Sequence, residues 1–328
     1  MAMKKIQYAV WKKETNNAGG KAKNDAYDIV EKLGFEASYK PSETRLIRVI
    51  QQYMSMHKFD AADVVFMQYP AVDFRILPSF LKHINGKKTT IALIHDLRSI
   101  QGSGEEEDIE EIPLLNKFKY IIAHNQRMTD YLKTKGCTSH IINLELFDYL
   151  HNASLSIQAP IGDGSIAFAG NLVKSTFIDG LSQVNNVKFF LYGNKGDKSF
   201  DGIDNVEYKG SLPSEEIVYK LEGDYGLVWD GDSVQTCSGK HGDYLRYNNP
   251  HKLSLYIAAG KPIITWKKAA IADFVKRNNI GIVVDSLNEL KDIPLSKDYD
   301  FMRSNVIMIK KEIAAGNYLS TALEKCRF

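Results

Sequence analysis

Short apolar runs alternate with amphipathic helical segments along nearly the whole chain. The runs are four to eight residues long and are bounded by glycine, proline or polar residues, a pattern typical of buried strands. The predicted strands lie at 5–11, 35–39, 63–69, 89–96, 165–171, 187–194, 206–210, 226–230, 262–265 and 281–285, and a further one ends at Ala123. The predicted helices lie at 22–33, 43–57, 72–84, 214–221, 250–259, 268–277 and 298–324. Alternation of this kind predicts the α/β class, with parallel doubly wound sheets.

The alternation occurs twice, which suits two Rossmann-like domains, because 328 residues exceed one ordinary α/β unit. The sequence becomes polar and loses its regular pattern over 151–164, as is typical of an interdomain linker. We therefore expect an N-terminal domain at 1–150 and a C-terminal domain at 165–297. The remaining tail, 298–328, either packs back on the first domain or makes a contact in a homo-oligomer, and the sequence leaves both open.

Composition excludes several classes of protein. Hydrophobic residues make up 44% and charged residues 25% of the chain, and the net charge is +2 without a basic tail. Nucleic-acid binding is therefore disfavoured. Three widely spaced cysteines fit a reducing compartment and exclude a disulfide framework. The start of the chain does not read as a signal peptide, and no apolar run approaches 18 residues. We expect a cytoplasmic protein; peripheral contact with the inner face of the membrane stays open.

The stretch from Tyr225 to Thr265 carries the strongest candidate chemistry. It reads as a strand, a long polar loop, a helix entered at Asn249–Pro250, and a second strand. Asparagine followed by proline is a common way to cap and begin a helix. Backbone N–H groups of a first helical turn lack intrahelical partners, so Lys252 beside them, with Asn249, predicts a seat for an anion. A phosphate-bearing ligand at the carboxyl edge of a parallel sheet is the first hypothesis.

A second cation follows an earlier strand of the same half. Lys174 comes just after a turn at Gly170–Asn171, and Gly193 ends the next strand. Paired lysines can neutralise a diphosphate as it departs, although most surface lysines are merely solvated. We expect Gly170, Asn171 and Gly193 to line the ligand crevice beside Lys174.

Asp230-Gly231-Asp232 resembles the DxD metal ligands of some sugar transferases. Two carboxylates two residues apart can hold Mg²⁺ or Mn²⁺ against a diphosphate. The pattern is weak by itself, because the same loop could simply stabilise its glycine turn.

The first half offers a glycine-containing turn and a carboxylate. Asn17, Gly19 and Gly20 follow the first strand and suit a turn with exposed backbone amides, or one that merely needs glycine. The GxGxxG fingerprint is absent, which disfavours a nicotinamide-dependent dehydrogenase. Asp96 ends an apolar strand, where a carboxylate can take a proton from an attacking hydroxyl; a helix cap or an ion pair with Arg98 is the alternative.

Other polar features of the sequence are less favoured as functional residues. His124 and His241 could each be a satisfied polar side chain. The acidic run over 102–111 is typical of a solvated loop or helix face.

At this point the chain resembles a known family. WDGDSVQTCSGKHGDYLRYNNPHKLSLY (229–256) and KKAAIADF (267–274) look like bacterial β-1,6-galactofuranosyltransferases of O-antigen assembly. Further similar stretches follow in the same order: AGGKAKNDAYDI (18–29), IHD (94–96), AHNQRMTDYL (123–132), LFDYL (146–150) and FAGNL (168–172). More distantly, the chain is similar to the glucosyltransferases that extend glycans on serine-rich streptococcal adhesins.

The resemblance implies a GT-B glycosyltransferase: two Rossmann-like domains facing across a cleft, with the nucleotide-sugar donor on the C-terminal one and the acceptor on the N-terminal one. Matching positions place Lys174 and Lys252 on the diphosphate, Gly19 and Gly20 along the cleft, and Asp96 at the catalytic edge. Such enzymes generally do without a bound metal, so the resemblance argues against Asp230 and Asp232 as metal ligands. The paired glutamates of many retaining relatives are missing, which favours inversion.

The sequence thus predicts hexosyl transfer from a UDP-sugar, expected to be UDP-galactofuranose, to a hydroxyl of a glycan or lipid-linked oligosaccharide in cell-surface polysaccharide synthesis. No cofactor is implied, because the UDP-sugar is a substrate. The alternatives are a UDP-glucose-dependent glucosyltransferase acting on a protein-linked glycan and a non-catalytic nucleotide-sugar-binding partner subunit.

Overall fold

The computed structural model describes residues 3–10, 18–70, 76–86, 89–101, 108–152, 156–292 and 298–328. The chain divides into two compact units. Unit 1 comprises Met1–Lys13, Ala22–Leu144 and Gly316–Phe328, and unit 2 comprises Glu14–Lys21 and Glu145–Ala315. Each unit is described by itself below.

Unit 1 is built on one six-stranded parallel sheet. Its strands are β1 (Lys5–Gln7), β2 (Glu36–Ala37), β3 (Val64–Tyr69), β4 (Thr89–Ile94), β5 (Tyr120–Ala123) and β6 (His140–Asn143). They lie in the order β2-β1-β3-β4-β5-β6, so the strand order reverses between β1 and β3. Its helices are α1 (Ala18–Lys32, most of which belongs to this unit), α2 (Arg45–Ser55), α3 (His57–Asp60), α4 (Leu77–Ile84), α5 (Arg98–Gln101), α6 (Asp108–Leu115), α7 (Gln126–Thr134) and α13 (Asn317–Glu324).

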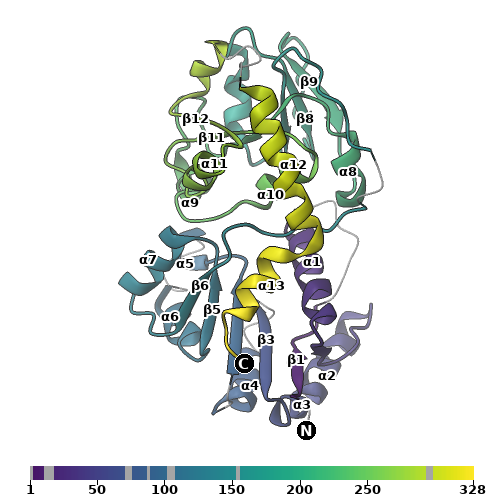
Figure 1. Ribbon diagram of the computed structural model, residues 1–328, viewed down its shortest axis with the longest axis vertical. Coiled ribbons are helices and arrows are strands. Elements are labelled where there is room, and N and C mark those ends of the chain that lie inside the picture. The colour runs from purple at the N-terminus through teal and green to yellow at the C-terminus, as the bar shows by residue number, and fades with distance from the viewer. Residues whose placement is uncertain are drawn as a thin grey trace. The chain divides into compact units, whose positions relative to one another are not determined.

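Unit 2 repeats the plan with a different strand order. Its strands are β7 (Ile166–Ala169), β8 (Phe189–Tyr192), β9 (Val206–Gly210), β10 (Tyr225–Val228), β11 (Ile263–Trp266) and β12 (Gly281–Val284). All neighbours are parallel in the order β12-β11-β10-β7-β8-β9, so the reversal falls between β7 and β10. Figure 1 shows β11 and β12 on one side of this unit and β8 and β9 on the other. Its helices are η2 (Thr176–Gln183), α8 (Ser214–Lys220), α9 (Gly239–Tyr244), α10 (His251–Ala258), α11 (Ala272–Arg277), η3 (Leu287–Asp292) and α12 (Tyr299–Ala315).

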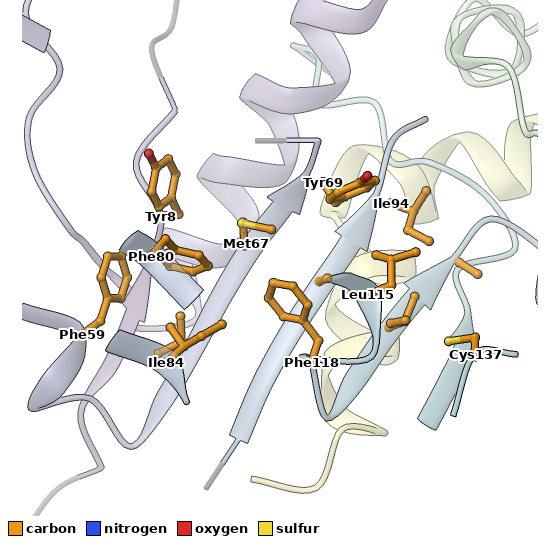
Figure 2. Packing of buried hydrophobic residues seen from close by; sticks show 14 of the residues in the cluster. Tyr8, Phe59, Met67, Tyr69, Phe80, Ile84, Ile94, Leu115, Phe118 and Cys137 are labelled. Atoms are coloured by element: carbon orange, nitrogen blue, oxygen red, sulfur yellow. The ribbon is translucent and has the colours of Figure 1, made fainter. Parts of the chain in front are cut away.

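The cores explain why these runs form strands. Every residue of β3 and β4 is buried, as expected for parallel strands covered on both faces, which therefore read as continuous apolar runs. In unit 1, Phe80 packs edge to face against both Tyr8 and Phe59, with ring centroids 5.3 and 5.0 Å apart (Figure 2). Aromatic pairs of this geometry stabilise a core beyond the area they bury. Unit 2 buries Trp229 and Trp266 completely.

The predicted fold class is confirmed: both halves are α/β units with all-parallel six-stranded sheets. The tail differs from its prediction. A single helix was expected over 298–324, but Gly316 adopts a left-handed φ of 78° between α12 and α13. A side chain at Gly316 would be strained by this φ and would collide with Ile29. The helix therefore breaks there, and the tail is divided between the two units, α12 in unit 2 and α13 in unit 1.

Candidate functional site

The strand reversal in unit 2 brings two predicted segments together. Gly170–Lys174 follows β7, and Trp229–Asp232 follows β10, its direct neighbour in the sheet. In open parallel sheets, ligands bind beyond the carboxyl ends of the strands where the strand order reverses. Both segments that carry candidate residues therefore lie at the position where sheets of this architecture bind ligands.

Lys252 spans these two segments from the first turn of α10. Its ammonium donates to the Trp229 carbonyl oxygen at 3.2 Å and pairs with Asp230 Oδ2 at 3.1 Å. It also lies 4.6 Å from the centroid of the Phe168 ring at the end of β7. Its side chain is 13% exposed. The cation is therefore held at the strand reversal, not turned into bulk solvent.

A buried hydrogen bond ties α10 to the sheet. The hydroxyl of Tyr256 accepts from the backbone N–H of Ala169 at 2.8 Å, and both residues are buried. Tyr256 is one turn beyond Lys252 on the same helix. This contact fixes the distance between the helix that carries the lysine and the end of β7.

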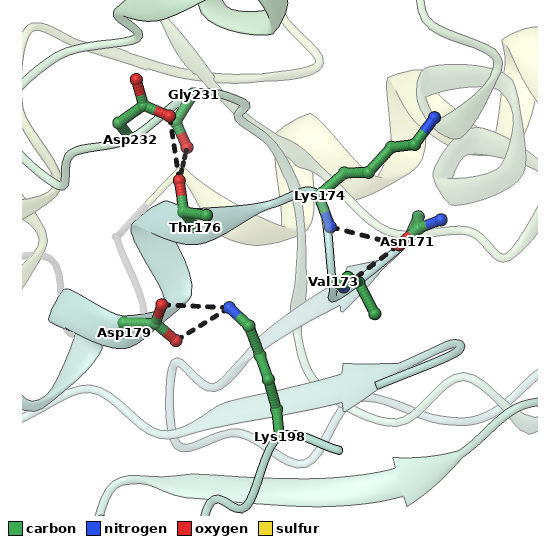
Figure 3. Close-up of polar contacts among 8 residues, drawn as sticks. All are labelled: Asn171, Val173, Lys174, Thr176, Asp179, Lys198, Gly231 and Asp232. Atoms are coloured by element: carbon green, nitrogen blue, oxygen red, sulfur yellow. Dashed lines mark hydrogen bonds and ion pairs between the residues drawn. The ribbon is translucent and has the colours of Figure 1, made fainter. Parts of the chain in front are cut away.

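The two carboxylates of the Asp230–Asp232 loop take different partners. Ser175 donates to Asp230 Oδ1 at 3.3 Å, opposite the oxygen that pairs with Lys252. Thr176 donates to Asp232 Oδ1 at 2.9 Å and to the Gly231 carbonyl at 3.4 Å (Figure 3). The loop after β10 is thus bonded to the start of η2. Within the described ranges, no three histidine, cysteine or acidic side chains gather as metal ligands would.

The turn after β7 is shaped by backbone contacts. Asn171 Oδ1 accepts from the N–H groups of Val173 and Lys174, at 3.1 and 3.2 Å (Figure 3). Gly193 adopts a φ of 130°, and a side chain there would collide with the Gly170 carbonyl oxygen. Gly170 itself lies beside the Lys252 ammonium. Gly170, Asn171 and Gly193 therefore lie together at the edge that carries Lys252.

Lys174 lies at the same turn but is exposed. Figure 3 shows its side chain directed away from the ion pair between Asp179 of η2 and Lys198. No carboxylate of the described residues lies within ion-pair distance of its ammonium. Lys174 is therefore a cation available to a ligand, whereas Lys252 is already held in place.

The expected role of Asn249 as the helix cap is wrong. The residue that caps α10 is Pro250, without a side-chain hydrogen bond, and the helix begins at His251. The Asn249 amide instead donates to the Glu145 carbonyl oxygen at 2.9 Å, and the side chain is buried. Because the proline φ already sets the entry to the helix, the asparagine is available to anchor the segment before it. The proposed contact of Asn249 with a diphosphate stays a prediction.

The histidine beside Lys252 contributes no charge. Burial, and secondarily the Lys21 cation, lower the pKa of His251 to about 3, against a hydrogen bond with Asp148. Its ring stacks on Tyr149 with centroids 5.0 Å apart. The first turn of α10 therefore presents one cation, Lys252, at neutral pH. The other histidine considered in this half, His241, is exposed.

In unit 1, Asp96 follows β4 and is partly buried. Burial lowers the pKa of Lys23, while the charge of Asp96 acts in the opposite direction. The Lys23 ammonium donates to the Pro70 carbonyl oxygen at 3.3 Å, just beyond β3. Asp96 thus lies at the carboxyl edge of its sheet, close enough to Lys23 for the two charges to interact.

The glycine turn of the first half was predicted wrongly. Gly19 and Gly20 lie in the first turn of α1, which begins at Ala18 and not near residue 22. Their amides therefore belong to a helix start. Asn17 lies outside the described residues. His124, also considered in this half, is buried and hydrogen-bonds to the Ile94 carbonyl oxygen at 3.1 Å, as a satisfied core histidine does.

Glu111 is a polar anchor that sequence reasoning missed. It belongs to the acidic run expected to be solvated, yet it is only 4% exposed. It accepts from the Tyr69 hydroxyl at 2.9 Å and from the backbone N–H groups of Arg98 and Ser99, both at 3.1 Å. It therefore caps α5, the role considered for Asp96. The apolar sequence IPLL that follows Glu111 could have indicated that this part of the acidic run is buried. In unit 2, Ser175, Thr176 and Tyr256 were missed as well.

Comparison with known proteins shows the family to which the chain belongs. The N-terminal domain model of the glucosyltransferase 3-like family matches residues 5–146, and its C-terminal domain model matches residues 166–326. The chain is 32% identical to the beta-1,6-galactofuranosyltransferase WbbI of Escherichia coli (strain K12), over 94% of each protein. It is 27% identical to glucosyltransferase 3 of Streptococcus gordonii, over 83% of this chain and 82% of that one.

Solved structures show the same fold. Anabaena HepE, in complex with UDP and glucose, aligns over 99% of both chains with a TM-score of 0.62 at 12% identity. AviGT4, a glycosyltransferase of avilamycin A biosynthesis, aligns over 99% of this chain and 96% of that one with a TM-score of 0.55. At such identities the likeness shows the fold alone, two Rossmann-like domains of the GT-B class.

Proposed function

The chain belongs to the glucosyltransferase 3-like family of glycosyltransferases, and from that premise we propose that it transfers a hexosyl unit from a UDP-sugar to a glycan hydroxyl. The sugar we propose is galactofuranose, and the product a cell-surface polysaccharide. The similarity to WbbI, whose name states a β-1,6-galactofuranosyl transfer, supports this choice of sugar. No metal or other cofactor is required in the proposal, because the UDP-sugar is a substrate.

The observation that carries the donor assignment is the position of Lys252. Its ammonium lies at the strand reversal of unit 2, between the ends of β7 and β10, where parallel sheets bind nucleotides. A diphosphate there would meet Lys252, the exposed Lys174 and the amides of the first turn of α10. The solved complexes of HepE with UDP support a nucleotide of this kind.

The proposed reaction is a single displacement. The acceptor oxygen forms a bond to the anomeric carbon while the bond from that carbon to the UDP oxygen breaks. The acceptor proton passes to the Asp96 carboxylate, and the negative charge that develops on UDP is stabilised by Lys252 and Lys174. Such a displacement inverts the anomeric configuration.

A second candidate is glucosyl transfer from UDP-glucose to a protein-linked glycan. The similarity to the streptococcal glucosyltransferase 3, over 83% of this chain, favours it. A non-catalytic subunit that binds a nucleotide sugar is the third, from a different class of function.

Release of UDP from a panel of UDP-sugars, with and without acceptor disaccharides, separates the three candidates. We expect UDP-galactofuranose with an acceptor disaccharide to give the fastest release, and NMR of the product to show the inverted anomer. Fastest release from UDP-glucose would support the second candidate. Binding of UDP in calorimetry without release from any donor would contradict transfer and leave the binding subunit.

A further inference from the structure

Asp230 places a negative charge where the proposed donor brings its own. Its Oδ2 lies 3.1 Å from the ammonium of Lys252, the group proposed to meet the diphosphate. Like charges that approach one another are destabilising, so a carboxylate at this position opposes donor binding unless it performs another task. The contacts of Asp230 indicate what that task is.

The Asp230 carboxylate is held through both of its oxygens. Oδ2 is paired with Lys252 on α10, and Oδ1 accepts from the Ser175 hydroxyl at 3.3 Å. Ser175 is itself buried, at 3% exposed, and its backbone N–H donates to the Asn171 carbonyl oxygen at 3.1 Å, in the turn after β7. The carboxylate therefore links α10 to that turn, and it cannot rotate without losing one of its two partners.

The Lys252 ammonium has three N–H donors. The Trp229 carbonyl oxygen and Asp230 Oδ2 accept two of them, at 3.2 and 3.1 Å. Among the residues that the structure describes, no third group accepts a hydrogen bond from this ammonium. Because the nitrogen is tetrahedral, the two occupied directions also fix the third. Lys252 therefore keeps one N–H for a ligand, and Trp229 and Asp230 determine its direction.

We propose that Asp230 is a positioning residue, which sets the direction in which Lys252 presents this N–H to the donor diphosphate, and that Ser175 holds Asp230 in place. The inference rests on the proposed function, because it gives both residues a part in that reaction. Charge develops on the diphosphate as the sugar leaves, and an N–H that is already aimed needs no reorganisation at that moment. The charges of Asp230 and Lys252 compensate each other, so the exposed Lys174 supplies the net positive charge of the site.

Direct contact of Asp230 with a sugar hydroxyl is the competing role. A carboxylate that bound the sugar would contribute to transfer whether or not Lys252 is present. A positioning residue contributes only through the group that it positions. The two roles therefore differ in how the effect of replacing Asp230 depends on Lys252.

Asp230→Asn tests this dependence. Asparagine has one oxygen, so it cannot accept from Ser175 and Lys252 through separate oxygens as the carboxylate does. We expect kcat for UDP release, at saturating donor and acceptor, to fall about tenfold, less than in Lys252→Ala because the cation itself remains. In the Lys252→Ala background the same substitution should lower kcat no further, because no ammonium is left to position.

Asp179→Asn is the matched control. Asp179 also pairs with a lysine, Lys198, at 2.9 Å, but its side chain is 61% exposed, so the substitution should change kcat less than about twofold in either background.

Ser175→Ala tests the outer link. It should lower kcat about threefold in the wild type and no further in Asp230→Asn, because the serine acts through the carboxylate. Ser199→Ala is its control, because the Ser199 hydroxyl donates to Asp201 at an exposed position and its loss should leave kcat unchanged. Circular dichroism checks folding. If Asp230→Asn unfolds, or if Lys252→Ala is too slow to measure, the remaining pair of links gives the same comparison.

The outcomes separate this inference from the proposed function. A wild type that releases no UDP from any UDP-sugar would overturn both. With an active wild type, the inference alone is overturned if Asp230→Asn keeps kcat within about twofold of wild type. An equal loss from Asp230→Asn with and without Lys252 would also overturn it, because the carboxylate would then act independently of the lysine.

Discussion

In the proposed reaction, Lys252 stabilises charge because its own bonds already hold it in position. Its ammonium is fixed by Trp229 and Asp230 before any ligand arrives, so little reorganisation is needed when charge develops on a leaving diphosphate. We therefore expect Lys252→Ala to lower kcat at least ~10²-fold. Steady-state release of UDP measures this.

The matched control is Lys267→Ala, in the same unit. Lys267 forms an ion pair with Asp285 in which both side chains are more than half exposed, so its loss is expected to change kcat less than about twofold. Near-normal turnover in Lys252→Ala would remove this lysine from the mechanism.

Asp96 can be separated from donor binding. In the proposed reaction it takes the proton of the acceptor hydroxyl, so Asp96→Asn should lower transfer by ~10²-fold or more. The affinity for UDP, measured by calorimetry, should stay nearly unchanged. If the variant loses UDP binding together with transfer, Asp96 has a structural role, as Glu111 has where it caps α5.

The buried His124 makes stability depend on pH. Burial lowers its pKa to about 4, against backbone hydrogen bonds that raise it. Between pH 6.5 and 4 the unfolded chain binds the proton that the folded chain excludes, so stability falls as pH falls through this window. The total loss is about 3 kcal/mol for a shift of this size. Urea unfolding at a series of pH values should show a shallower loss for His124→Gln than for wild type.

The same experiment has an internal comparison. His251 also has a lowered pKa, about 3, so part of the loss persists in His124→Gln and becomes smaller again when both histidines are replaced. Equal slopes for wild type and His124→Gln would show that His124 is protonated in the folded protein without cost.

At the scale of single elements, α10 shows what sequence reasoning could and could not predict. The helix and Lys252 in its first turn follow from Pro250 and the apolar run behind it. The hydrogen bond that holds α10 against β7 joins Ala169 and Tyr256, which are 87 residues apart in the sequence. The local sequence pattern therefore could not predict it. The predicted capping role of Asn249 was wrong for the same reason. Its amide bonds to the carbonyl of Glu145, which is 104 residues away in the sequence.

The Tyr256 bond can be tested directly. Tyr256→Phe leaves the Ala169 N–H buried without its acceptor, which should lower the free energy of unfolding by about 1–3 kcal/mol. Tyr219→Phe is the control, because the Tyr219 hydroxyl donates to the Asn152 carbonyl at an exposed position and its loss should cost about 0.5 kcal/mol or less. Urea unfolding measures both. Equal stabilities of the two variants would contradict a locking role for Tyr256.

At the scale of the whole molecule, the α/β class could be predicted because parallel strands that are buried on both faces appear in the sequence as continuous apolar runs. The order of the strands within each sheet could not be predicted from the sequence. The orders β2-β1-β3-β4-β5-β6 and β9-β8-β7-β10-β11-β12 both arise from the same alternation of strand and helix. The order reverses between β1 and β3 in one sheet and between β7 and β10 in the other. The position of the reversal determines which loops lie next to each other at the carboxyl edge of the sheet. Lys252 could therefore be predicted as an anion-binding residue, but its neighbours Phe168 and Trp229 could not.

If unit 2 binds the donor as proposed, UDP should stabilise this unit against unfolding. A ligand that binds only the folded state stabilises it, by about 2.7 kcal/mol at a concentration 100 times its Kd. Of the three tryptophans, Trp229 and Trp266 belong to unit 2 and Trp11 to unit 1. In a Trp11→Phe background, tryptophan fluorescence therefore follows the unfolding of unit 2 alone.

With UDP at that concentration we expect the fluorescence Tm of Trp11→Phe to rise by several degrees. Adding Asp96→Asn should leave the rise intact, because that carboxylate belongs to unit 1 and to the acceptor in the proposed reaction. Adding Lys252→Ala should remove most of the rise, because the diphosphate then loses the cation that α10 holds at the strand reversal. A full rise that survives Lys252→Ala would place UDP elsewhere, even if transfer itself is observed.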